Sequence, residues 1–180
     1  MKIFITGRPG IGKTTVFMKV VEMLRREGSK VLGFYCPEAR EGGVRIGFRI
    51  VDIETGESGW LALARDRFEG TCVGRIGRYC VIREDAERIA LKILERFYSS
   101  AVLAVDEIGP MELMIDSLRN LIDRFLSSEK PGVYVVHERI VGELMRRYHD
   151  AQIYRITEAN RSEASLDIFS RIIRYISRER

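Results

Sequence analysis

The sequence predicts an α/β fold: a three-layer sandwich in which a mainly parallel sheet lies between helices, with a β-rich insertion at one edge. Two observations predict it. Short apolar runs alternate with amphipathic segments of helical spacing before residue 37 and again after residue 83, as in βαβ units around a parallel sheet. Residues 37–83 instead hold several β-rich runs in succession. At 180 residues, the chain is expected to form one domain, 1–180, that contains this insertion.

The first elements surround a glycine-rich loop. Residues 2–6, "KIFIT", are expected to form a buried strand that ends at Gly7, and residues 30–36, "KVLGFYC", form the next strand. Between them, residues 14–27 carry apolar side chains at helical spacing, and Gly28 provides a C-terminal stop.

In the insertion, the β-rich runs "GVRIGFRIVDI" and "SGWLALAR" are separated by "ETGE", which suits a hairpin. The segment "EGTCVGRIGRYCVI" continues as loop and strand, so we expect antiparallel strands at the edge of the main sheet. Alternation then returns, and the expected elements are helix 83–100, strand 101–107, helix 114–128, strand 132–137, helix 138–149, strand 151–157 and helix 162–177. The first of these helices is expected to bury Ala86, Ile89, Ala90, Ile93, Leu94 and Phe97.

Composition narrows the choice of partners and compartment. The net charge is +4, but the basic residues are mostly arginines scattered among carboxylates, which is typical of a solvated surface. A nucleic-acid partner is therefore left open and is not indicated. No apolar run approaches the roughly 18 residues of a membrane span, and the first strand leaves no room for a secretory signal. The sequence sets no oligomeric state, and a monomer is one option.

The cysteines favour a cytoplasmic protein. Cys36, Cys72 and Cys80 are odd in number and lack C-x-x-C spacing. This argues against a disulfide framework or a zinc site and favours a reducing cytoplasm.

The segment "GRPGIGKT" fits the phosphate-loop (Walker A) pattern G-x-x-x-x-G-K-[ST]. In such a loop the backbone amides form an anion nest, to which the following helix adds the positive end of its dipole. We expect Lys13 to reach the β- and γ-phosphates, Thr14 to ligate Mg²⁺, and Thr15 to bond the α-phosphate. The predicted nucleotide-binding residues of the loop are Gly7, Arg8, Pro9, Gly10, Ile11, Gly12, Lys13, Thr14 and Thr15.

This loop has two possible interpretations other than a nucleoside-triphosphate site. A dinucleotide-binding fingerprint does not require Lys-Thr at the helix start, and no acidic residue ends strand 30–36 to bind a ribose. The other alternative is a glycine loop that merely turns the chain.

A second motif, "VLAVDEIGPME", ends a buried strand with two carboxylates, as a Walker B motif does. Ligands of open α/β sheets bind at that edge, so Asp106 is expected to hold Mg²⁺ opposite Thr14. The neighbouring Glu107 is expected to orient and deprotonate water. The alternative is that both acids cap the next helix. Glu112 is assigned to the first turn of that helix, where negative charge is favoured.

This pair resembles the P-loop proteins that carry an extra strand between the phosphate-loop strand and the Walker B strand. The resemblance implies strand order 5-1-4-3-2, which here reads 151–156, 2–6, 132–137, 101–106 and 30–36. It also implies that a polar residue at the end of the intervening strand senses the γ-phosphate. Here that residue is His137; the alternative is a histidine that merely completes the edge of the core.

Five features occur together in one order and spacing: "GRPGIGKTT", "GFYCPEAREGGVRIGF", "DEIGPMEL", the strand-ending His137 and "TEANR". From residue 1 to about residue 175, the chain resembles the small nucleoside-triphosphatase family of thermophilic archaea and bacteria, whose animal relative is called cancer-related nucleoside triphosphatase. The resemblance implies a RecA/kinase-like P-loop NTPase sheet. It also implies Mg²⁺-dependent hydrolysis of ATP, GTP and other nucleoside triphosphates to diphosphates. One departure is that Arg78 and Cys80 stand where lysine and glycine are expected.

Three further residues are candidates near the phosphates and the base. Arg40, in "PEAREGG", is a candidate arginine finger supplied in cis, and the alternative is a surface arginine bonded to Glu38 or Glu41. In "TEANR", Asn160 and Arg161 lie where related folds place the base, and a guanidinium stacked on any base suits loose specificity. A cap for the last helix explains Asn160 equally well.

These residues lead to a predicted nucleoside-triphosphatase in which Glu107 activates water while Lys13, Mg²⁺ and Arg40 neutralise the leaving phosphate. The first alternative is a kinase whose acceptor site is formed by the 37–83 insertion. The second is an ATPase or switch stimulated by nucleic acid.

Overall fold

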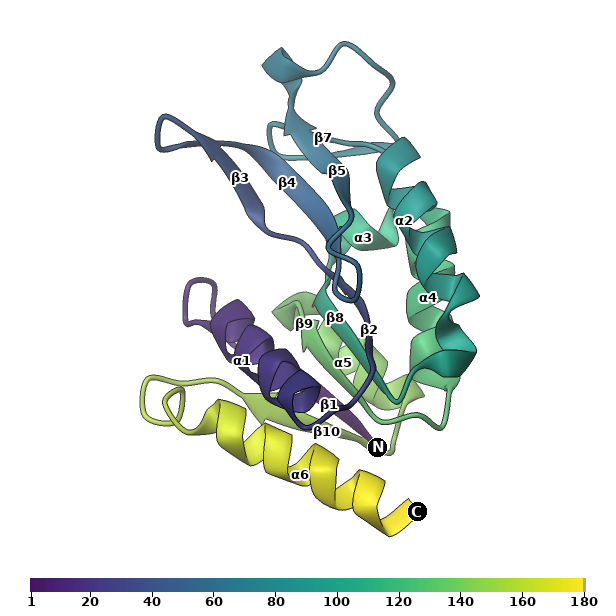
Figure 1. Cartoon of the computed structure of the whole chain (residues 1–180). Coiled ribbons are helices and arrows are strands. Elements are labelled where there is room, and N and C mark those ends of the chain that lie inside the picture. Colours follow the sequence, from purple (N-terminus) through teal and green to yellow (C-terminus); the bar gives the residue numbers. More distant parts are fainter. Residues whose placement is uncertain (180) are drawn as a thin grey trace.

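A ten-stranded sheet runs through the computed structural model of the chain, which describes residues 1–179 (Figure 1). The strand order is β10-β1-β9-β8-β2-β4-β5-β7-β6, and β3 pairs with β4 beside this path. The strands are β1 Lys2–Thr6, β2 Val31–Tyr35, β3 Glu38–Glu41, β4 Val44–Asp52, β5 Ser58–Ala64, β6 Gly74–Ile76, β7 Tyr79–Val81, β8 Val102–Ile108, β9 Gly132–Val136 and β10 Ala151–Arg155.

The first five strands of this order, β10, β1, β9, β8 and β2, are parallel to one another. This confirms the predicted order 5-1-4-3-2. As a result, the carboxyl ends of β1, β8 and β9 meet at one edge of the sheet, where the glycine-rich loop also begins. Chain segments far apart in sequence are therefore brought to one place by strand pairing.

Helices cover both faces of the sheet, so the fold is the predicted three-layer sandwich (Figure 1). The helices are α1 Lys13–Arg26, α2 Glu84–Glu95, α3 Pro110–Leu113, α4 Asp116–Ser127, α5 Glu138–Arg147 and α6 Ala164–Glu179, with 3₁₀ turns η1 Arg65–Arg67 and η2 Phe97–Ser99. Along β1, Ile3 and Ile5 pack in the cluster that contains α1 and α6, whereas Phe4 packs in the cluster that contains α2, α4 and α5. This alternation follows from the two-residue period of a strand.

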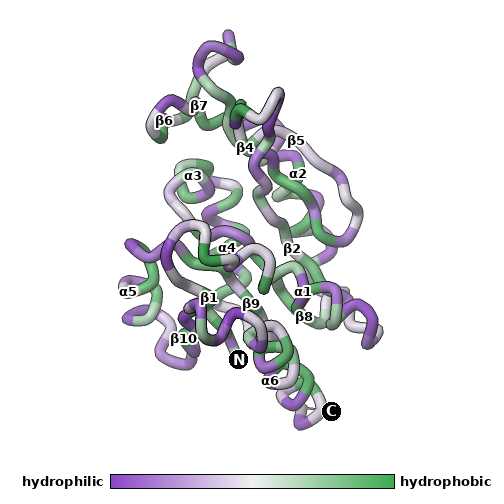
Figure 2. The backbone as a smooth tube through the Cα atoms, turned by 90° about the vertical axis from the view of Figure 1, so that its left-hand side faces the viewer, coloured by the Kyte–Doolittle hydropathy of each residue, from purple (hydrophilic) through white to green (hydrophobic). Residues whose placement is uncertain are grey.

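The insertion extends the sheet with antiparallel strands. β4 pairs with β2 through Phe34↔Asp52 and Tyr35↔Val51, and β4 and β5 form the predicted hairpin. Residues 38–41, which were not predicted as a strand, form β3 along the other side of β4. Figure 2 shows β6 and β7 beyond α3, at the end of the molecule furthest from α6.

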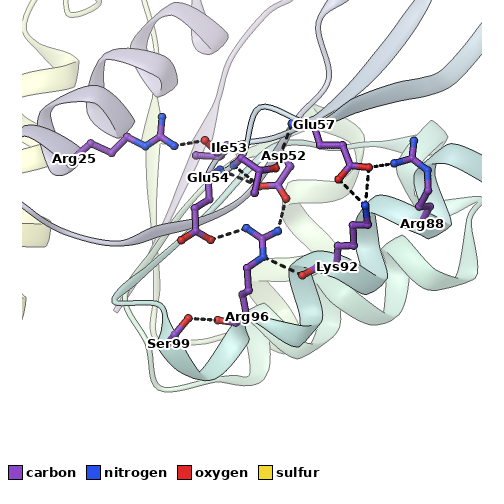
Figure 3. A network of polar contacts seen from close by, with 10 residues as sticks. Arg25, Asp52, Ile53, Glu54, Glu57, Arg88, Lys92, Arg96 and Ser99 are labelled. Carbon is purple, nitrogen blue, oxygen red and sulfur yellow. Dashed lines mark hydrogen bonds and ion pairs between the residues drawn. The ribbon is translucent and has the colours of Figure 1, made fainter.

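A polar network fixes the β4–β5 turn to the helices on both sides (Figure 3). The buried carboxylate of Asp52 is paired with the guanidinium of Arg96, which also contacts Glu54 at 2.6 Å. Arg25 of α1 donates to the Ile53 carbonyl oxygen. On the far side of the turn, the Glu57 carboxylate contacts Arg88 and, at 2.9 Å, Lys92. The β4–β5 turn of the insertion is therefore fixed between α1 and α2.

Two sequence-based expectations need correction. The structure contains a Cys72–Cys80 disulfide with a Cα–Cα distance of 5.2 Å, although the cysteine count argued against a disulfide framework. The reason is that the β6–β7 hairpin brings these two cysteines together and leaves Cys36 as the free thiol. The cysteine argument for a reducing cytoplasm therefore no longer applies, and the compartment stays a prediction. Leu94, expected to be buried, is 42% exposed because α2 buries a narrower stripe.

Within residues 1–179, no helix combines the length and the apolar character needed to cross a bilayer.

Candidate active site

The phosphate loop, residues 7–14, connects β1 to α1 in a conformation that requires glycine. Gly12, at the start of α1, has φ 105°, a left-handed value that side chains rarely adopt. A Cβ atom on Gly7 would lie 2.8 Å from the backbone oxygen of Ile156, so this glycine allows the loop to pass close to the end of β10. The side chain of Ile11 is buried in the core beside α1, which fixes the middle of the loop.

The loop's polar side chains point in different directions. The Lys13 ammonium donates to the carbonyl oxygens of Gly7, at 2.9 Å, and Arg8, at 3.4 Å, so it lies across the opening of the loop. Thr14 and Thr15 are exposed in the first turn of α1. The exposed Arg8 guanidinium forms an ion pair with Glu158 in the segment after β10. This pair links the loop to the segment that holds the predicted base-binding residues.

Asp106 and Thr14 are brought together as the sequence predicts. The Thr14 hydroxyl lies beside the Asp106 carboxylate, which is 4% exposed at the end of β8. Burial raises the pKa of Asp106 to about 6, and the nearby charge of Glu107 adds to the shift. The Thr14 hydroxyl and the Lys13 charge act in the opposite direction. A cation placed beside this buried carboxylate would stabilise its ionised form.

The donor set at this point suits a hard divalent cation. A threonine hydroxyl and a carboxylate offer oxygen ligands, which Mg²⁺ prefers, and Mg²⁺ commonly takes its remaining ligands from water and substrate phosphates. Across the described residues, no group of three or more His, Cys, Asp and Glu side chains could hold a metal by itself. The arrangement therefore fits a cation that arrives with a polyphosphate.

Glu107, the next residue, is half-buried on the same edge. Burial raises its pKa above the ordinary value, while the positive charge of Lys13 opposes the shift. A raised pKa makes this carboxylate a better proton acceptor when it is ionised. Asp106 and Glu107 therefore differ in surroundings: Asp106 is buried beside the Thr14 hydroxyl, and Glu107 is half-buried near the charge of Lys13.

Glu112 is buried, a feature that the sequence analysis did not predict. It lies in α3, a short helix that precedes the expected one, and only 5% of it is exposed. Burial raises its pKa to about 8, and the charges of Glu107 and Asp106 contribute to the shift. The carboxyl group shares a hydrogen bond with the Cys36 thiol at the end of β2. The apolar residues on both sides of Glu112 in "PMELM" were the available signal for a buried position.

His137 lies where the resemblance implies, directly after β9. Its backbone N–H donates to the Ile108 carbonyl oxygen at 3.1 Å. Its Nδ1 accepts from the Arg139 backbone N–H at 3.3 Å, so the ring caps α5. The residue is half-buried and lines the same cavity as Lys13 and Glu107.

The remaining predicted residues lie further from the phosphate loop's cavity or are engaged elsewhere. Arg40 pairs with Glu38 at 2.7 Å and donates to the Gly43 carbonyl oxygen at 2.9 Å, which matches the alternative considered for it. The Asn160 side chain accepts from the Thr157 backbone N–H at 2.8 Å and donates to the Arg155 carbonyl oxygen at 2.9 Å, whereas only its backbone carbonyl oxygen accepts from the start of α6.

Arg161 is exposed, and no side-chain hydrogen bond or ion pair connects it to the rest of the described residues. Its guanidinium is therefore free of competing partners in the segment after β10.

Two cavities meet the phosphate loop. The first, of about 470 Å³, lies on the β10 side and is lined by Gly7, Arg8, Ile11 and residues 155–159. The second, of about 510 Å³, lies on the β8 side and contains Lys13, Thr14, Asp106, Glu107, Glu112 and His137. Larger hollows of about 720 and 700 Å³ lie at the amino ends of the strands, beside Met1, and neither includes the loop. The predicted chemistry therefore gathers in the second cavity.

Comparison with known proteins gives consistent findings. A family model described as NTPase matches residues 2–169. The protein named nucleoside-triphosphatase THEP1 of Saccharolobus solfataricus is 42% identical over 173 residues, which cover 96% of this chain and 93% of that protein. The protein of the same name from Methanopyrus kandleri is 42% identical over 178 residues, covering 97% and 96%.

Two solved structures share the fold. The crystal structure of THEP1 from the hyperthermophile Aquifex aeolicus matches with a TM-score of 0.79 and 34% identity, covering 96% of this chain and 99% of that one. The solution structure of a human cancer-related nucleoside triphosphatase matches with a TM-score of 0.78 and 31% identity, covering 95% and 96%. Because these matches cover 96% and 95% of this chain, they include the insertion as well as the parallel sheet.

Proposed function

This chain belongs to the NTPase family and is a nucleoside-triphosphatase, and we propose that it hydrolyses nucleoside 5′-triphosphates of several bases with Mg²⁺, releasing diphosphate and phosphate. The observation that supports the proposal most strongly is that the Thr14 hydroxyl and the buried Asp106 carboxylate lie side by side in one cavity. It places the phosphate loop within reach of the Walker B carboxylate. A loop that merely turned the chain would have no need of this contact.

Substrate binding rests on the loop and on Lys13. The backbone amides of residues 7–14 and the N-terminus of α1 favour a polyphosphate, and the Lys13 ammonium stabilises charge on the β- and γ-phosphate oxygens. When the substrate is present, this ammonium exchanges its bonds to the Gly7 and Arg8 carbonyl oxygens for phosphate oxygens. Thr14 and Asp106 hold the Mg²⁺, which neutralises phosphate charge when bound.

Glu107 is the proposed general base. It orients a water molecule and accepts its proton while the water oxygen attacks the γ-phosphorus. The bond between that phosphorus and the β–γ bridging oxygen breaks, and the electron pair leaves with the diphosphate. The half-burial and raised pKa of Glu107 support this role. His137, in the same cavity, is proposed to sense the γ-phosphate, and Arg40 would have to leave Glu38 to stabilise the developing charge.

Loose base choice is proposed from Asn160 and Arg161, which directly follow the residues that line the cavity on the β10 side. A planar guanidinium stacks on any base, and Arg161 is free to do so, with Asn160 holding the backbone of the segment in place. This would give similar turnover with ATP, GTP, CTP and UTP.

The test is a comparison of Glu107→Gln with the native chain. The variant should bind a Mg²⁺–nucleotide normally and should lose turnover by about 10²–10⁴-fold, because it keeps the shape of the side chain but cannot accept a proton. Phosphate release and nucleotide binding are measured separately. Lys13→Ala serves as the contrast, because we expect it to lose tight binding. Turnover of Glu107→Gln near the native rate would contradict the proposed base, and His137 would be tested next.

A further inference from the structure

Two cavities lie beside the phosphate loop, but a nucleotide has only one base. The base can therefore occupy one of them and leaves the other for a different molecule. In the sheet, β1 separates β10 from β9 and β8, so the cavities lie on opposite sides of the loop. The base is proposed to lie on the β10 side. The second cavity, of about 510 Å³, then extends from the γ-phosphate end past Glu107. Its lining also includes Gly10, Gly12 and Thr14 of the phosphate loop, so the phosphates take part of this volume and leave the part toward the insertion.

Part of the wall of this cavity is apolar and comes from outside the parallel sheet, alongside the Glu38 carboxylate of β3. Phe48 of β4 and Ile76 of β6 line it from the insertion, and Met111 of α3 lines it from the Walker B side. All three side chains are half-buried, so part of each faces the cavity. Attack by water needs a polar position beside Glu107 and gains nothing from this surface. An apolar wall in the same cavity as the phosphate loop and Glu107 suits the body of a second molecule.

This wall is held in place before any ligand arrives. The Phe48 ring packs edge-to-face on Tyr79, with ring centroids 5.2 Å apart, and the Arg45 guanidinium lies 5.2 Å from the Phe48 centroid. Arg45 is itself fixed by Glu38 at 2.5 Å and by the Tyr79 hydroxyl at 2.9 Å. A site whose side chains are locked by their neighbours loses little conformational entropy on binding.

The β6 part of the wall is supported in the same way. The Cys72–Cys80 disulfide ties the residues on either side of the β6–β7 hairpin. Gly74 lies directly against Met114, so that an added Cβ atom would be 2.5 Å from the Met114 sulfur atom. Ile76 is therefore positioned by a hairpin that is fixed both covalently and by packing against the segment after α3.

We propose that this cavity is an acceptor site, in which a small hydroxyl-bearing molecule with an apolar ring receives the γ-phosphoryl group in place of water. The proposal rests on the proposed function, because it uses the same nucleotide and the same Glu107. The ring lies against Phe48, Ile76 and Met111, and the hydroxyl lies where water would otherwise attack. The alcohol oxygen forms a bond to the γ-phosphorus, the bond to the β–γ bridging oxygen breaks, and Glu107 accepts the hydroxyl proton. The products are a phosphate monoester and the nucleoside diphosphate.

The experiment measures how the γ-phosphoryl group divides between water and added alcohols. ATP labelled at the γ-phosphorus is turned over in the presence of methanol or 2-phenylethanol at equal concentration, and labelled ester and inorganic phosphate are separated. The site predicts at least about tenfold more ester, relative to phosphate, from 2-phenylethanol than from methanol, because burial of the ring raises the local concentration of its hydroxyl group. Equal ratios for the two alcohols, or no ester from either, would overturn the proposal.

Two variants test whether the preference for 2-phenylethanol arises in this cavity. Phe48→Ala should bring the ratio for 2-phenylethanol down toward that for methanol. Val44→Ala should not, because Val44 is an apolar residue of the same strand that is 58% exposed and lies outside the cavity lining. A preference unchanged by Phe48→Ala would overturn the assignment to this cavity. Phosphate release without alcohol reports on the proposed function alone, so normal release together with equal ester ratios would reject the acceptor site and leave the hydrolase intact.

Discussion

At the scale of single residues, burial divides three of the four carboxyl groups of the second cavity into different roles. The charge of the fourth, Glu38, is offset by its ion pairs with Arg40 and Arg45. Asp106 is buried beside Thr14, Glu107 is half-buried and faces Lys13, and Glu112 is buried against Cys36. With a pKa of about 8, Glu112 carries its proton at neutral pH and adds no negative charge behind the phosphates. The negative charge of the site is thus concentrated on the two residues proposed to bind metal and water.

The buried Glu112 predicts how stability depends on pH in the metal-free protein. Its folded pKa of about 8 lies above the ordinary 4.5, so above pH 4.5 the unfolded chain releases a proton that the folded chain keeps. Stability should therefore be full below pH 4.5 and should fall as the pH rises toward 8. The pKa of Asp106 is raised from 3.8 to about 6, so its ionisation also lowers stability, over the pH range between these two values. Urea unfolding at pH 5 and pH 8.5 in the presence of a chelator measures the loss.

Glu112→Gln should lose less stability than the native chain between these two pH values, because a neutral amide does not ionise. The matched control is Glu95→Gln, an exposed carboxylate at the end of α2. Equal losses for Glu112→Gln and the native chain would show that Glu112 is ionised in the folded protein at neutral pH.

Single residues were predictable where a motif fixes both residue type and spacing. The approach of Thr14 to Asp106 follows from the two motifs together with the parallel sheet. The burial of Glu112 was not predictable, because it depends on how α3 packs against the end of β2. The pairing of Arg40 with Glu38 was one of two alternatives, and the formation of β3 favours it because both residues lie on that strand.

At the scale of elements, an ion pair between the buried Asp52 carboxylate of β4 and Arg96 joins the insertion to the end of α2. Arg96→Ala should lower the free energy of unfolding by about 3 kcal/mol, because it leaves the Asp52 carboxylate buried without its cation. Lys92→Ala, which removes an exposed partner of Glu57, should cost no more than about 1 kcal/mol. Denaturant titration of both variants makes the comparison. Equal costs would show that the Asp52 pair contributes no more than a surface pair.

The Cys72–Cys80 disulfide should also contribute to the stability of the insertion. Closing a loop with a sequence separation of 8 stabilises the fold by about 2–3 kcal/mol in the chain-entropy description. Adding a reductant should therefore lower the unfolding midpoint of the native chain. It should not change that of a variant with Cys72→Ala and Cys80→Ala, and Cys36→Ala should respond like the native chain. A native chain that is indifferent to reductant would contradict a role for the disulfide in stability.

Elements with strong periodicity were predicted well, and those without it were missed. The inner parallel strands are short apolar runs and the helices between the strands repeat apolar residues with a period of 3.6, and the structure confirms these elements. β3, with the sequence "EARE", has no apolar alternation and is a strand because its backbone pairs with β4. α3 is a single short helix after Gly109, too brief for a periodic signal. The Cys72–Cys80 disulfide depends on hairpin register, which the spacing of cysteines does not specify.

At the scale of the whole molecule, the strand order decides where the chemistry lies. Because β9 lies between β1 and β8, the phosphate loop, Asp106 and His137 end at one edge of the sheet. The insertion then closes this edge from the β2 side, and the segment after β10 closes it from the other. The chain therefore holds one phosphate position between two cavities, one proposed for the base and one for an acceptor.

Calorimetry of a non-hydrolysable ATP analogue tests the central claim most directly, namely that the loop encloses a polyphosphate whose metal ion is held by Thr14 and Asp106. The native chain should bind the analogue with Mg²⁺ at least about tenfold more tightly than with a chelator, a difference of about 1.4 kcal/mol. Asp106→Asn should remove most of that difference and should keep the metal-independent binding. Equal affinity of the native chain with and without Mg²⁺, or no heat of binding at all, would contradict the claim.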